Sequence, residues 1–126
     1  MRLLIGVLVT LGLLIGSGIW INAWLQDSSR RLVQQIEAVN GQIETGDWAQ
    51  AFVQVEELER KWDQEAKWWP VFLEHQEMDN IEFSLARCQE YVAWRNDALS
   101  MGQLAETRLM IEHIPRKEEI NLENIL

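Results

Sequence analysis

The chain has 126 residues, and its 20 acidic side chains outnumber its 11 basic ones, which gives a formal net charge of -9. This balance argues against nucleic acid as a partner, because neutralising backbone phosphates requires clustered lysine and arginine. The single cysteine, Cys88, has no second cysteine with which to form a disulfide inside the chain. With only two histidines as well, the composition disfavours the usual zinc ligand sets, and no cofactor is expected.

The first element in the chain is an apolar run from Leu3 to Leu25. As an α-helix it would be about 35 Å long, enough to cross a hydrocarbon layer of about 30 Å with modest tilt. Trp20 and Trp24 lie one helical turn apart near its end, and such amphipathic rings favour the headgroup level. The sequence therefore predicts a transmembrane anchor over residues 1–26.

A cleaved signal peptide is the competing interpretation of the same segment. Residues 3–15 have the length of a signal-peptide apolar core, and the small residues 16–18 resemble a cleavage site. The apolar run nevertheless continues to Leu25, where a cleaved precursor would normally have become polar. This continuation favours a retained anchor.

The orientation of the anchor is weakly encoded, because the positive charges on its two sides are nearly balanced: Arg2 and the amino terminus precede it, and Arg30 and Arg31 follow it. A short N-terminal flank followed by a large C-terminal domain favours an N terminus inside the cell. We therefore expect a single-pass protein of the cell membrane whose residues 27–126 form one extracytoplasmic domain.

Two helices are predicted between the anchor and Pro70. The first continues from the anchor as a stalk, and Gly46 suits the left-handed position that ends it. Asp47 is placed to cap a second helix that begins at Trp48 and loses its regularity before Pro70. Their apolar stripes are Leu25, Leu32, Ile36, Val39 and Ile43 in the first helix, and Trp48, Phe52, Val55, Leu58 and Trp62 in the second.

Two further helices are predicted after residue 77. Asp79 or Asn80 is the expected N-cap of a third helix whose apolar stripe is formed by Ile81, Leu85, Cys88 and Val92. A fourth helix is expected from Ala98 until Ile114 and Pro115 stop it, with the apolar residues of segment 120–126 packing back onto the domain. No strand-like alternation is present, so the expected fold is all-α: a transmembrane helix continuing into a small antiparallel bundle of about four helices.

Several strings in the chain match a known family pattern. They are Gly46-Asp47-Trp48, residues 75–82, residues 84–87, Glu112-His113-Ile114-Pro115 and residues 122–126. With them the chain resembles the uncharacterised bacterial family catalogued as domain of unknown function 4363. The resemblance covers essentially the whole chain. It implies a short, single-span, mostly helical protein of spore-forming Gram-positive bacteria, in some cases encoded beside a multi-span membrane protein, and it assigns no activity.

A ligand or metal site is one candidate function. His75, Asp79 and Glu82 lie in the densest cluster of titratable residues, and His113 could join them if the fourth helix returns beside this segment. The competing interpretation is that these side chains cap helix ends and cover the surface. The chain contains no phosphate-binding glycine loop, nucleophile elbow or paired metal motif, so an enzyme is not expected.

An interaction surface at the base of the bundle is the preferred hypothesis. The side chains of adjacent Trp68 and Trp69 point about 100° apart on a helix, so both cannot face one narrow core. The second and fourth helices should run back toward the membrane, and the surface would comprise Trp68, Trp69, Phe72, Arg116 and Lys117. The alternative is an apolar patch buried against the tail.

The expected function is that of a non-enzymatic, membrane-anchored accessory module that engages an integral membrane protein or the membrane surface. The ligand- or metal-binding sensor is the first alternative. A self-associating structural protein of the envelope is the second, because the apolar stripe over residues 32–43 could pair between chains of a homo-oligomer.

Overall fold

The fold was examined in a computed structural model that describes residues 1–71 and 73–125, with side chains described as far as Pro115. Its elements are α1 (Arg2–Glu44), α2 (Trp48–Glu65), the short 3-10 helix η1 (Trp69–Val71), α3 (His75–Ala93) and α4 (Asp97–Ile125). The described residues form no strand. The all-α prediction is therefore confirmed.

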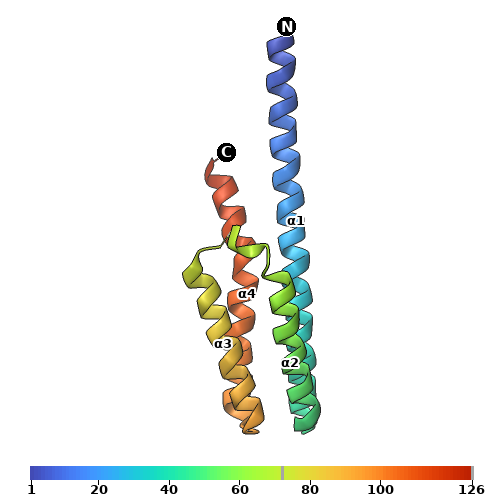
Figure 1. Ribbon diagram of the computed structural model, residues 1–126, viewed down its shortest axis with the longest axis vertical. Helices are drawn as coiled ribbons and strands as arrows, with labels where there is room; N and C mark the ends of the chain where they lie inside the picture. The colour runs from blue at the N-terminus through green and yellow to red at the C-terminus, as the bar shows by residue number, and fades with distance from the viewer. Residues whose placement is uncertain (72, 126) are drawn as a thin grey trace.

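The four helices form an antiparallel bundle from which the N-terminal half of α1 projects, and the C-terminal end of α4 extends past η1 on the same side (Figure 1). α1 packs against α2 and α4, and α3 packs against the same two helices. The two hairpin turns, at Gly46 and Arg95, lie together at one end of the bundle, which we call the distal end. η1 lies at the opposite, proximal end, beside the middle of α1 (Figure 1).

α1 is one unbroken helix of 43 residues, as the sequence predicts for an anchor that continues into a stalk. Residues 2–17 of α1 are exposed, whereas from Leu25 onward an apolar stripe is buried against α2 and α4. By length and composition, α1 is the one helix among the described residues that is long and apolar enough to cross a membrane.

The turn between α1 and α2 has the predicted backbone conformation and helix cap. Gly46 has a φ of 76°, a left-handed conformation that glycine adopts without a Cβ penalty. The Asp47 side chain accepts a hydrogen bond from the Gln50 backbone N–H at 3.1 Å, so it is the N-cap of α2. Val55, Leu58 and Trp62 are buried as expected, while Trp48 and Phe52 are only partly buried.

α3 begins earlier than the sequence predicted. Its N-cap is Glu74, with extended backbone and no side-chain cap, so the assignment of Asp79 or Asn80 as N-cap was wrong. The extra turn is stabilised by burial of Met78 and by Glu77, whose negative charge in the first turn complements the helix dipole. The apolar stripe of α3 is buried as predicted, at Ile81, Leu85, Cys88 and Val92.

Pro115 does not end α4, which continues to Ile125, so the predicted helix stop was wrong. A proline inside a helix has no N–H to donate to the carbonyl four residues earlier, here that of Ile111. The Ser29 hydroxyl, from α1, donates to this carbonyl at 3.1 Å. The Ser29 hydroxyl thus replaces the N–H donor that the Ile111 carbonyl lacks because residue 115 is proline. The predicted packing of residues 120–126 lies outside the described side chains.

Candidate interaction surface

Tryptophans from two parts of the chain form an apolar groove at the proximal end of the bundle. The groove is lined by Trp20, Ile21 and Trp24 of α1 and by Trp68, which lies between α2 and η1. The Trp20 side chain is 70% exposed and that of Trp68 is 66% exposed. We call these four residues the tryptophan groove.

The course of the chain explains why these residues meet. Trp20 and Trp24 are four residues apart, so they share one side of α1. α2 runs antiparallel to α1 from the distal turn and ends beside the middle of α1 (Figure 1). Trp68, three residues after the end of α2, therefore lines the same groove as Trp24. The groove lies where the exposed apolar half of α1 gives way to the buried half.

Trp69, which the sequence analysis placed on the same surface, belongs to the core instead. Its side chain is fully buried and packs edge-on against Trp62, with ring centroids 5.1 Å apart and an interplanar angle of 88°. The two adjacent tryptophans therefore diverge, one outward and one inward. Phe72 and the side chains of Arg116 and Lys117, the other members of the predicted surface, lie outside the described part.

Next to the groove, the end of α2 is attached to α1 by a carboxylate clamp formed by Ser28, Arg31 and Glu65. Arg31 donates to both Glu65 oxygens, from Nε at 2.8 Å and from Nη2 at 3.1 Å, and the Ser28 hydroxyl donates to Oε2 at 2.6 Å. The Arg31 hydrogen bonds, helped by Ser28, hold the pKa of Glu65 below its usual value against the opposing effect of burial. Because the folded state prefers the ionised carboxylate, the clamp stabilises the fold above the ordinary glutamate pKa and less as the pH falls below it.

Sequence reasoning missed this clamp and the Ser29 contact. The available signal was the pair of serines, Ser28 and Ser29, which follow the apolar run after Gln26 and Asp27 and are both buried. Neighbouring residues on a helix point about 100° apart, so the two serines can contact two different helices. Ser28 contacts α2, and Ser29 contacts α4.

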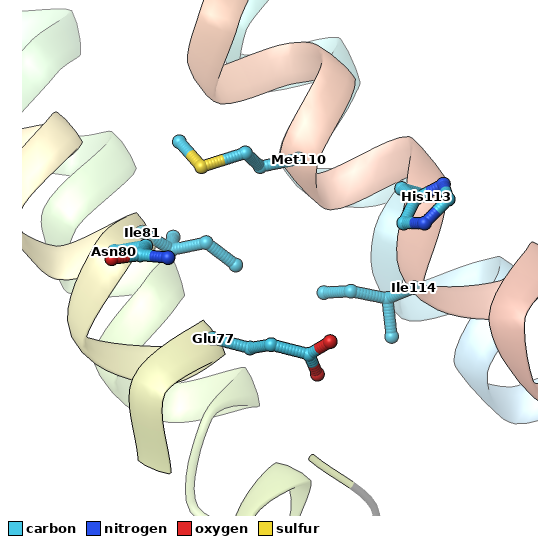
Figure 2. A pocket seen from close by; sticks show the side chains of 6 residues that line it. All are labelled: Glu77, Asn80, Ile81, Met110, His113 and Ile114. Atoms are coloured by element: carbon cyan, nitrogen blue, oxygen red, sulfur yellow. The ribbon is translucent and has the colours of Figure 1, made fainter. Parts of the chain in front are cut away.

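The predicted ligand residues do not gather at one site. His75, Asp79 and Glu82 are exposed on α3, away from its buried stripe, and among the described residues no group of three His, Cys, Asp or Glu side chains is placed to hold a metal. His113 lies on α4 instead, beside a small pocket between α3 and α4 (Figure 2). Glu77, Asn80, Ile81, Met110 and Ile114 complete the pocket lining.

A buried polar cluster joins the middle of α3 to α4. The hydroxyls of Ser84 and Thr107 are 2.5 Å apart, and Gln103 Nε2 donates to Ser84 at 2.6 Å. Cys88 Sγ lies 3.4 Å from the Thr107 hydroxyl, and burial is the main cause that raises the pKa of this thiol to about 11. Cys88 is therefore a buried, protonated core residue at neutral pH, as its place in the apolar stripe predicts.

Comparison with known proteins gives a family but no activity. No curated protein and no solved structure matches the chain. The family model described as "Domain of unknown function (DUF4363)" matches residues 19–125, a span that includes the tryptophan groove, the carboxylate clamp and all of α2 to α4. The chain therefore belongs to the family of the domain of unknown function 4363.

Proposed function

We propose that the protein is a non-enzymatic accessory module, anchored in the cell membrane by the N-terminal half of α1, that engages an integral membrane protein through the proximal end of its bundle. The observation that carries the proposal is the tryptophan groove, since two of its rings stay largely exposed after folding. Exposed tryptophans that lie together are more typical of binding surfaces than of free protein surface.

The position of the groove supports a membrane partner. The exposed part of α1 is apolar, and Trp20 and Trp24 lie at the end of that part, where a helix would leave the hydrocarbon layer. A partner that reaches the groove would then contact the protein at the headgroup level. The short N-terminal flank of α1 supports the further part of the proposal, in which the N terminus lies inside the cell and the bundle outside.

A single substitution in the groove tests the proposal. Trp68→Ala should weaken capture of the membrane partner from mild-detergent extracts by roughly 30-fold, because truncating a tryptophan at the centre of an interface typically costs about 2 kcal/mol or more. Partner capture is quantified with the full-length protein expressed at equal levels.

Trp94→Ala is the matched control, because Trp94 is also an exposed tryptophan, 80% exposed, but follows α3 at the distal end. This variant should capture the partner as well as the unchanged protein does. If Trp94→Ala abolished capture and Trp68→Ala left it intact, the interaction surface would lie at the distal end, and the proposal would be wrong.

A further inference from the structure

Glu65 occupies a position that its own helix disfavours. It is the last residue of α2, where the helix dipole is negative, and the last turn of α2 contains no basic residue. A carboxylate there destabilises the isolated helix, so its contribution comes from the partners on α1. Arg31 and Ser28 are those partners, and both lie outside α2.

The clamp and the groove are one helical turn apart. On α1, Trp24 precedes Ser28 by four residues, so the two lie on the same side of the helix. On the α2 side of the helical hairpin, Trp68 follows Glu65 by three residues. Because the helices are antiparallel, moving from Ser28 to Trp24 on α1 corresponds to moving from Glu65 to Trp68 beyond the end of α2.

We infer that Ser28, Arg31 and Glu65 are positioning residues of the interaction surface: by attaching the end of α2 to α1, they hold Trp68 against Trp24 and Ile21. On the other side of Trp68, the buried ring of Trp69 fixes the chain to the core. Trp68 is thus held between two attachment points, the carboxylate clamp and the buried ring of Trp69. The role of these residues in partner binding rests on the proposed function, whereas their effect on the position of Trp68 does not.

Disulfide trapping across the groove tests the inference. In a Cys88→Ser background, Ile21→Cys and Trp68→Cys place two thiols on residues that line the same groove. With the full-length protein in lipid vesicles, Glu65→Gln should slow disulfide formation under a mild oxidant several-fold, because the amide loses the charge that Arg31 binds.

Glu57→Gln is the matched control, since Glu57 pairs with Arg60 inside α2 and makes no bridge to α1. It should leave the trapping rate unchanged. The exchange of charges in Arg31→Glu with Glu65→Arg should restore most of the rate lost in Glu65→Gln. The inference would be overturned if disulfide formation were as fast with Glu65→Gln as with Glu65. It would also be overturned if the exchanged charges failed to restore the trapping rate.

Partner capture by the same substitutions, in the protein that retains Ile21 and Trp68, separates this inference from the proposed function. Slower trapping together with weaker capture by Glu65→Gln supports both. Slower trapping with unchanged capture supports the positioning role and contradicts the use of the groove for partner binding.

Discussion

Replacing Trp69 by alanine should destabilise the fold strongly, whereas replacing the adjacent Trp68 should change its stability little. Trp69→Ala should lower the free energy of unfolding by about 3 to 5 kcal/mol, as truncation of a buried aromatic ring does. Trp69 is fully buried and meets Trp62 edge-on at 5.1 Å, so the substitution leaves a cavity and removes an aromatic pair. Since small domains are stable by only about 5 to 15 kcal/mol, this change removes much of the total.

Trp68→Ala, one residue earlier, should change the free energy of unfolding by less than about 1 kcal/mol because its ring is largely exposed. Urea unfolding of the full-length protein in mild detergent, followed by circular dichroism, measures both variants. Trp69→Phe is a further control: it keeps a ring in the core and removes an indole N–H that has no acceptor among the described residues. Equal destabilisation by the two alanine substitutions would contradict their assignment to surface and core.

The hydrogen bond between α1 and α4 should be needed only because α4 contains a proline. Ser29→Ala should cost about 1 to 3 kcal/mol, the usual penalty for leaving a buried polar group without a partner. The Ile111 carbonyl would then have neither the Ser29 hydroxyl nor an N–H from residue 115. Pro115→Ala supplies that N–H.

A double-mutant cycle isolates this dependence. In the Pro115→Ala background, Ser29→Ala should cost at least about 1 kcal/mol less than in the unchanged protein, because the helix now satisfies the Ile111 carbonyl itself. Denaturant unfolding of the four proteins gives the coupling. The same cost of Ser29→Ala in both backgrounds would show that the hydroxyl does not substitute for the missing proline donor.

Local rules in the sequence predicted the features that depend on neighbouring residues. Gly46 and Asp47 have the conformation and hydrogen bond expected of a helix stop and a helix cap. The stripe of Ile81, Leu85 and Cys88 is buried because helical periodicity alone places these residues on one face. Four helices in an antiparallel arrangement follow from such stripes and short turns.

Features that depend on distant residues could not be obtained in this way. Pro115 is a helix stop by local rules, but the Ser29 hydroxyl, 82 positions before Ile111 along the chain, donates to the carbonyl that Pro115 leaves without a helical donor. The sequence indicated that Trp68 and Trp69 cannot both face the core. Which of the two rings is buried depends on the position of Trp62, against which Trp69 packs. His75 and His113 were grouped on the condition that the fourth helix returns beside the third; α4 does pack against α3, but His113 lines the pocket between them and His75 does not.

The depth of residue 68 in a bilayer is the most direct measurement of whether the tryptophan groove faces the membrane. Spin labels are attached to a single cysteine, Trp68→Cys or Trp94→Cys, in Cys88→Ser protein reconstituted in lipid vesicles. Collision with a water-soluble nickel reagent and with oxygen then reports depth. We expect the label at 68 to lie at the headgroup level, with reduced nickel access, and the label at the distal position 94 to be in bulk water. Equal nickel access at 68 and 94 would contradict a membrane-facing groove and, with it, the proposed mode of partner binding.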